Sequence, residues 1–140
     1  MSEQNKAVVR RWFEECDRQH GPGEELCTPS FTAHHPGTAA MNLTVFQQTT
    51  RAIYAAIPDL RHSVEGMIAE GDKVAGQVSV RGTHQGGELM GVAPTGKQIT
   101  VSGIVFARIE GGKVAEYWGG AHQLGIMRQI GATPGPAPAS

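Results

Sequence analysis

Histidine is the residue type of this chain best suited to acid–base chemistry, because the unperturbed imidazole pKa of about 6.5 lies near working pH. His122 follows the last alternating apolar run, in which Trp118 is the residue expected to be buried. Alternate residues of a strand share one side, so Trp118 and His122 share a phase unless a bulge at Gly119-Gly120 resets it. We therefore predict that His122 faces an interior pocket beside Trp118 and moves a proton there. A structural histidine at a strand-to-helix junction is the alternative.

The pair His34-His35 is the second concentration of imidazole. Adjacent residues of an extended segment point to opposite sides, so at most one of the two faces the pocket, and we take His34 as the second catalytic candidate. His84 ends another alternating run, where it either orients a substrate or caps a turn. The patterns around His20 and His62 indicate exposed surface residues.

Motifs for cofactors and metals are missing or incomplete. The run Gly91 to Lys97 approaches a phosphate-binding loop, but Gln98 stands where Ser or Thr must reach magnesium, and a strand pattern follows instead of a helix. No spacing typical of zinc, dinucleotide or serine-hydrolase sites occurs in the sequence. We predict no cofactor and no metal, although folding could still bring His34, His84 and His122 together.

Length and composition restrict the class of protein. The chain has 140 residues, enough for one domain, which we expect over residues 1–131, with residues 132–140 as a flexible tail rich in Pro, Ala and Gly. The net charge of −1 offers no basic excess for nucleic acid, and no apolar run reaches the roughly 18 residues that cross a membrane. Cys16 and Cys27 form no C-x-x-C pair and no signal peptide is evident, so we expect a cytoplasmic protein.

The hydrophobic period changes once along the chain. Helical spacing covers residues 3–20 and 44–57, with Thr44 as the expected N-cap of the second helix. Alternation then predicts strands over residues 61–70, 73–84, 98–110 and 113–121, followed by a short helix over 122–130. The turn pairs Gly71-Asp72 and Gly111-Gly112 make these strands an antiparallel meander.

Helices followed by a long sheet predict an α+β fold in which the helices cover one face of the sheet. The strand over residues 98–110 would span about 43 Å if it were straight, so it must curve, with Gly103 as the candidate bend. The concave side of a curved sheet leaves a hollow that side chains or a ligand must fill.

Seven short segments, met in order along the chain, carry a family resemblance. They are Val9-Arg10-Arg11-Trp12-Phe13, His34-His35-Pro36-Gly37, Ile57-Pro58-Asp59-Leu60, Ala69-Glu70-Gly71-Asp72-Lys73-Val74, Gly82-Thr83-His84-Gln85-Gly86, Gly91-Val92-Ala93-Pro94-Thr95-Gly96-Lys97 and Gly112-Lys113-Val114-Ala115-Glu116-Tyr117-Trp118. In these segments the chain resembles the SnoaL-like polyketide cyclases of the nuclear transport factor 2-like superfamily, over residues 5–131.

The resemblance implies a cone of curved antiparallel strands packed on N-terminal helices, a deep apolar pocket, and a homodimer packed through its sheets. It also implies ring closure by an intramolecular aldol step, without a cofactor, in which an acidic residue on the last strand moves the proton. His122 stands here where such proteins typically carry an aspartate. An imidazole can act as base and then as acid, so the site is expected to keep its role.

The pocket is expected to be roomy and apolar, because Gly103 and Val105 occupy inward positions that some relatives fill with polar residues. This favours a bulky, apolar small molecule as substrate. The residues predicted to bind it are Trp118, Tyr54, His84, Ser102, Phe106, Met90 and Val105.

The leading functional hypothesis is an enzyme of small-molecule biosynthesis that closes or isomerises a ring of a polyketide-like substrate, either through His122 as acid–base catalyst or by shape alone. A different enzyme on the same fold is the first alternative: one that opens an epoxide with Glu116 or Glu88, or one that assists a hydroxylation. A non-catalytic module that binds a small molecule is the second.

Overall fold

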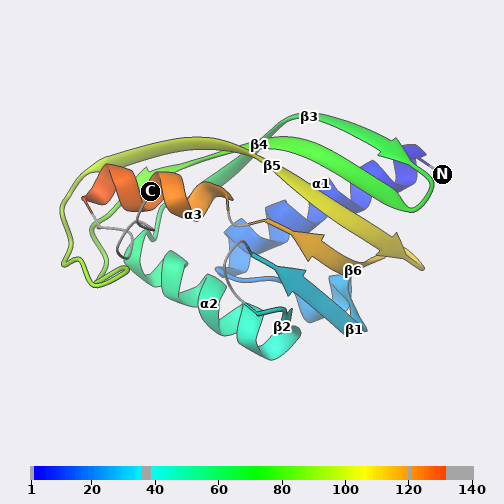
Figure 1. Cartoon of the computed structure of the whole chain (residues 1–140), viewed down its shortest axis with the longest axis horizontal. Helices are drawn as coiled ribbons and strands as arrows, with labels where there is room; N and C mark the ends of the chain where they lie inside the picture. The colour runs from blue at the N-terminus through cyan, green and yellow to red at the C-terminus, as the bar shows by residue number, and fades with distance from the viewer. Residues whose placement is uncertain (1, 36–38, 120, 132–140) are drawn as a thin grey trace, which may run out of the picture.

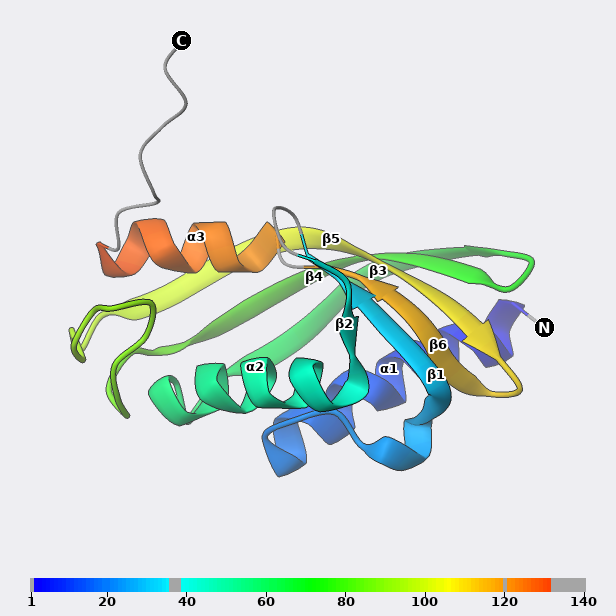
Figure 2. The same cartoon turned by 60° about the horizontal axis from the view of Figure 1, so that its bottom comes forward.

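The chain is described by a computed structural model over residues 2–35, 39–119 and 121–131. Figure 1 shows a curved six-stranded sheet with the strand order β2-β1-β6-β5-β4-β3, and Figure 2 shows it curving over α1 and α2, with α3 beside β5. The fold is therefore α+β, as predicted; the tail predicted over residues 132–140 lies outside the described part. The elements are α1 (Ser2–Gln19), η1 (Glu24–Leu26), β1 (Cys27–His34), β2 (Met41–Asn42), α2 (Leu43–Ala56), β3 (Arg61–Glu70), β4 (Lys73–Thr83), β5 (Gln98–Glu110), β6 (Lys113–Trp118) and α3 (Ala121–Ile130).

The helices form where the apolar spacing predicted them, within one residue at each end. α2 begins at Leu43 because the side chain of Asn42 accepts a hydrogen bond from the backbone N–H of Val45, at 2.9 Å. Thr44, the expected cap, lies inside the helix, so that assignment was wrong. In the described part of the chain, no helix combines the length and the apolar character needed to cross a bilayer.

The predicted meander is confirmed, since β3, β4, β5 and β6 pair in sequence order and antiparallel. The sequence did not predict β1, which runs parallel to β6 and places Ala33 beside Tyr117 and His34 beside Trp118. Its partner lies more than 80 residues further along the chain, and Pro29 interrupts the local strand pattern. The pairing is irregular between Cys27 and Thr32, the stretch that contains this proline.

A bulge at Ala115 decides which residues of β6 face inward. Ile109 pairs with Val114 and Arg108 pairs with Glu116, so Ala115 is the extra residue of β6, and both Val114 and Ala115 are buried. After the bulge Tyr117 faces the helices and Trp118 faces outward. The inward orientation predicted for Trp118 is therefore wrong, because the extra residue at Ala115 inverts the alternation of β6 before Trp118 is reached. His122 does not continue this alternation, since it lies in α3.

Aromatic rings fill the space between α1, α2 and the concave side of the sheet. The Trp12 ring lies parallel to that of Phe46, with 6.0 Å between the centroids, and 4.6 Å from the ring of Tyr117. Trp12, Phe46 and Tyr117 are buried, and burial of each such side chain stabilises the fold by about 1.5–3 kcal/mol. This cluster holds the helices against the sheet beside the cavity described below.

α3 covers the part of β5 that β6 does not reach. The Gln129 side chain accepts a hydrogen bond from the backbone N–H of Thr100, at 2.9 Å, and donates one to its carbonyl, at 2.7 Å. These two bonds replace a neighbouring strand at an otherwise open edge. Gly125 lets the helix approach the sheet, because a Cβ at this position would lie 2.5 Å from Cγ1 of Val101.

The close approach of α3 predicts that Gly125→Ala destabilises the protein by about 1–3 kcal/mol, since helix and strand must separate to admit the methyl group. The matched control is Gly66→Ala, where the added Cβ meets no atom within 4 Å, and we expect a change within about 0.5 kcal/mol. Urea unfolding followed by circular dichroism measures both. Equal stability of the two variants would refute the packing of α3 on β5 described here.

Candidate active site

An apolar cavity of about 80 Å³ lies between α1, α2, the first turn of α3 and the concave side of the sheet. It is smaller than the roughly 300–1,000 Å³ of pockets that enclose drug-sized ligands. In this conformation it therefore receives a small reacting group and not a whole polycyclic molecule, in contrast to the roomy pocket predicted. Its walls include Trp12, Phe13, Phe46, Tyr54, His62, Tyr117, His122 and Ile126.

His122 faces this cavity, as predicted, from the first turn of α3. Its Nε2 lies 2.7 Å from the backbone carbonyl of Val78. A carbonyl oxygen only accepts, so Nε2 carries the proton, and the lone pair of the neutral ring is on Nδ1. Burial lowers the pKa of His122, and the hydrogen bond to Val78 only partly offsets this effect. The ring is thus a neutral base at neutral pH, with its basic nitrogen fixed by the bond that the other nitrogen makes.

A second imidazole, that of His62 on β3, lines the same cavity. Its Nδ1 lies 2.7 Å from Oδ1 of Asp17, and its backbone N–H donates to Oδ2 of the same carboxylate at 2.8 Å. Because the carboxylate accepts, Nδ1 carries a proton and Nε2 is the remaining nitrogen. The sequence interpretation of His62 as a surface residue was wrong. His62 shares the inward phase of Val64, which was the signal in the sequence that could have identified it.

Asp17 also accepts a hydrogen bond from the hydroxyl of Tyr54, at 2.6 Å. Burial by itself raises the pKa of Asp17, but the hydrogen bonds from His62 and Tyr54 outweigh burial and hold the pKa below its usual range. Asp17 is therefore a carboxylate at neutral pH. The ring of Tyr54 lines the cavity as predicted, whereas its hydroxyl is bonded to Asp17.

Four of the predicted site residues face the opposite, convex side of the sheet or its surface. Trp118 stacks on His34, with 5.1 Å between the ring centroids, and meets the edge of Phe106 at 5.4 Å. Ser102 shares the outward phase of Phe106 and is exposed. His34 and Trp118 therefore lie away from His122, contrary to prediction: the bulge at Ala115 turns Trp118 outward, and of the pair His34-His35 it is His35 that lines the cavity.

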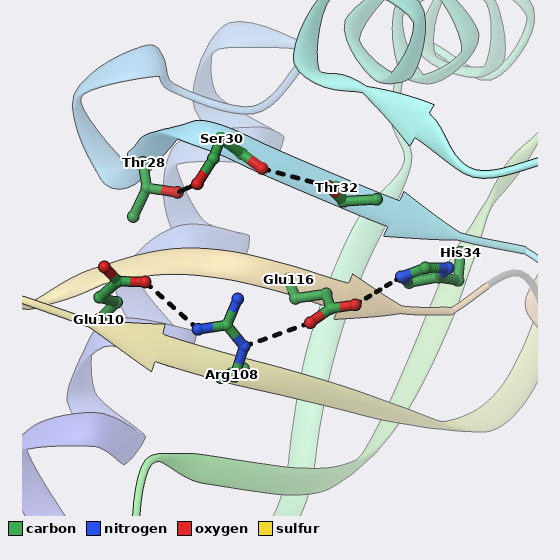
Figure 3. A network of polar contacts seen from close by, with 7 residues as sticks. All are labelled: Thr28, Ser30, Thr32, His34, Arg108, Glu110 and Glu116. Carbon is green, nitrogen blue, oxygen red and sulfur yellow. Dashed lines mark hydrogen bonds and ion pairs between the residues drawn. The ribbon is translucent and has the colours of Figure 1, made fainter.

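On the convex side His34 belongs to a polar network (Figure 3). Its Nε2 lies 2.7 Å from Oε2 of Glu116, whose other oxygen accepts a hydrogen bond from Arg108 at 3.2 Å. The hydrogen bond from His34 lowers the pKa of Glu116. This network fixes Glu116 outside the cavity, so its carboxylate is not available to a substrate held beside His122.

The remaining predicted site residues, His84, Met90 and Val105, do not line the cavity. His84 is fully buried in the loop between β4 and β5, where Nε2 donates to the carbonyl of Gly87 at 2.9 Å and Nδ1 contacts Thr95. Met90 lies in the same loop with a positive φ of 52°, and Val105 is a buried residue of β5 outside the cavity wall. His34, His84 and His122 are thus not brought together, and the described residues contain no group of three or more potential ligands placed to hold a metal ion.

The family model of the SnoaL-like polyketide cyclases matches residues 7–130. No curated protein matches the sequence. Among solved structures, a proposed SnoaL-like polyketide cyclase from Jannaschia sp. CCS1 is 26% identical, with a TM-score of 0.80 and 95% of each chain covered. AclR from Streptomyces galilaeus, a proposed hydroxylase, is 25% identical, with a TM-score of 0.78 over 97% of this chain and 85% of AclR.

IdmH from Streptomyces antibioticus, a proposed polyketide cyclase, shares the fold at 24% identity and a TM-score of 0.76, with 91% of this chain and 99% of IdmH covered. Since the family model covers most of the chain, this protein belongs to the SnoaL-like polyketide cyclases. Its fold is that of the nuclear transport factor 2-like superfamily, and it is an enzyme of a cyclase family.

The geometry predicts the tautomer of each cavity imidazole. His122 should be neutral with the proton on Nε2, and should remain neutral to a more acidic pH than the roughly 6.5 of free histidine, because burial disfavours the cation. Nδ1 of His62 should carry a proton in the neutral ring and in the imidazolium alike, because it bonds to the Asp17 carboxylate. Long-range ¹H–¹⁵N NMR of the imidazole rings during a pH titration measures both. A protonated Nδ1 on neutral His122 would contradict the orientation of the ring.

Proposed function

We propose that this protein closes a ring in a polyketide-like substrate by an aldol reaction, without a cofactor, and that His122 is the base. One observation carries the proposal: the imidazole of His122 lines a cavity of aromatic walls while its Nε2 is bonded to the Val78 carbonyl, which leaves Nδ1 as the basic nitrogen. An acid–base group of this kind, held within reach of a carbon acid, contributes about 10²–10⁴-fold to a rate.

The reaction follows from that arrangement. Nδ1 of His122 takes a proton from a carbon beside a ketone, and the electron pair of the C–H bond forms the enolate. The enolate carbon then bonds to a second carbonyl carbon of the same molecule, and the π electrons of that carbonyl move to its oxygen, which takes up a proton. Trp12, Phe46 and Tyr117 exclude water from the enolate, which protects the charged intermediate from competing protonation.

The size of the cavity indicates how such a substrate binds. A volume of about 80 Å³ admits the ketone end of a molecule, so the remainder must extend outward past α2 and α3 or displace their side chains. Apolar walls select an apolar substrate. The opening of an epoxide by Glu116 receives no support, because that carboxylate is bonded to His34 and Arg108 on the other side of the sheet.

The test uses 2,6-heptanedione, a small 1,5-diketone whose aldol product is 3-hydroxy-3-methylcyclohexanone. We expect the protein to accelerate this ring closure over buffer, and His122→Ala to lower the rate by about 10² or more, since the base is lost. Arg128→Ala, an exposed change on the same helix, is the control and should leave the rate unchanged. NMR of the product mixture gives the rates.

An unchanged rate for His122→Ala would eliminate His122 as the base and leave catalysis by shape. Hydroxylation is the second candidate, favoured by the likeness to AclR. Mass spectrometry separates the two: aldol closure keeps the mass of the diketone, while hydroxylation adds one oxygen atom.

We also propose that the protein is a homodimer joined through the convex side of the sheet. A row of cross-strand neighbours runs across this side, from Ile68 through Ala75 and Phe106 to Trp118. Ile68 is 75% exposed and Ile104, next to the row on β5, is 62% exposed. Monomeric proteins rarely leave a large contiguous apolar patch in water, and a second copy of the same sheet offers a matching surface.

The dimer is tested by Phe106→Lys, which places a charge in the apolar row and should convert the dimer to a monomer because an unpaired ammonium resists burial. Thr100→Lys, an exposed outward position further along β5, is the control and should remain dimeric. Sedimentation velocity measures the mass of each. A monomeric parent protein would rule out the dimer.

A further inference from the structure

We propose that His62, aligned by Asp17, is a second catalytic residue of the cavity and donates the proton that converts the newly attacked carbonyl into a hydroxyl. The inference deepens the proposed ring closure and rests on it. It concerns a step that His122 does not perform. A base in an apolar cavity creates a carbanion, but the oxygen that becomes negative when the C–C bond forms also needs a proton donor.

His62 and Asp17 are held by more hydrogen bonds than are needed to join β3 to α1. The backbone N–H of His62 donates a hydrogen bond to Oδ2 of Asp17, and this bond would by itself be enough to tether β3 to α1. The ring adds a bond to Oδ1 at 2.7 Å, and Tyr54 fixes the same oxygen from α2 at 2.6 Å. Three bonds from two elements thus hold the carboxylate, which in turn holds the imidazole in one orientation.

In that orientation Nδ1 of His62 is occupied, and Nε2 is the nitrogen that can react with a substrate in the cavity. The ring of Phe13 packs on the imidazole with 4.9 Å between centroids. The side chain of His62 is 16% exposed and that of Asp17 is 10% exposed, so both are sheltered from bulk water.

The two imidazoles differ in the charge that their surroundings favour. The titratable groups that line the cavity with His62, or bond to it, are Asp17 and Cys16 from α1, His35 after β1, Tyr54 from α2, Tyr117 from β6 and His122 from α3. Only Asp17 carries a full charge of opposite sign, and an imidazolium on His62 makes this pair neutral overall. A positive His62 also disfavours protonation of His122, which burial already disfavours. His122 and His62 therefore differ in their surroundings, and we assign the base to the first and the acid to the second.

The step balances within the cavity. His122 Nδ1 takes the proton from the carbon beside one ketone, the new C–C bond forms, and the π electrons of the second carbonyl move to its oxygen. That oxygen takes the proton from Nε2 of His62. His62 is then neutral and His122 is charged, and transfer of one proton from His122 to His62 through water restores the starting state.

The experiment compares two rates on 2,6-heptanedione. Exchange of its α-hydrogens in D₂O needs only the base, whereas ring closure needs both the base and the acid. His62→Gln removes the acid and keeps an amide that can bond to Asp17; Asp17→Asn removes the charge that aligns and stabilises the imidazolium. Ser63→Ala, an exposed neighbour on the same strand, is the control, and thermal melts verify that each variant folds.

We expect His62→Gln to retain α-hydrogen exchange within about threefold while ring closure falls by about 10² or more. Asp17→Asn should show the same division between the two rates, because the imidazole loses the carboxylate that orients it. A purely structural pair would lower both rates together.

Equal losses of exchange and closure in His62→Gln or in Asp17→Asn would overturn the role of His62. Failure of the proposed function has a different signature. In that case the parent protein accelerates neither reaction over buffer. If the NMR signals of His62 in the parent protein also do not respond to added diketone, this inference is overturned as well.

Discussion

His62 and His122 each have one ring nitrogen bonded to a fixed acceptor, and the chemistry proposed for the protein depends on this constraint. Val78 offers a carbonyl to Nε2 of His122, and Asp17 offers a carboxylate to Nδ1 of His62. Burial lowers the pKa of His122, whose bond to Val78 leaves Nδ1 as the basic nitrogen, and the bond to Asp17 leaves Nε2 of His62 as the nitrogen that can meet a substrate. The proposed mechanism thus gives two residues of one type opposite roles, and the aromatic walls around them strengthen polar interactions by excluding water.

The bulge at Ala115 decides which residues of β6 lie on the concave side of the sheet and which lie on the convex side. Because β6 gains one residue there, Tyr117 completes the aromatic wall of the cavity, and Trp118 joins the apolar row on the convex side. Without the extra residue, Trp118 and Glu116 would face the helices. Glu116 would then no longer reach His34 and Arg108 on the convex side. One inserted residue therefore places Tyr117 on the concave side, where we propose catalysis, and Trp118 on the convex side, where we propose the dimer contact.

The sequence predicted what depends on local patterns. The strands over residues 61–70 and 98–110 match β3 and β5 at both ends, because alternation and glycine turns mark them clearly. The family and the inward orientation of His122 were also predicted. What failed depends on distant partners: β1 pairs with β6 across most of the chain, and Asp17 reaches His62 only when α1 packs on β3. Trp118 was misplaced because a bulge leaves no reliable mark in a sequence of apolar residues.

The central claim, that the base His122 and the acid His62 act on one substrate held between them in the cavity, is tested most directly with 4-nitrophenol, whose phenolate resembles the enolate formed in the reaction. A titration of the protein with this compound, followed by NMR of the imidazole nitrogens and the indole N–H groups, locates the binding site. The account predicts that the signals of His62 and His122 shift together with saturation while the indole signal of Trp118 stays in place. Shifts confined to Trp118 and His34, or no response of the cavity imidazoles, would contradict it.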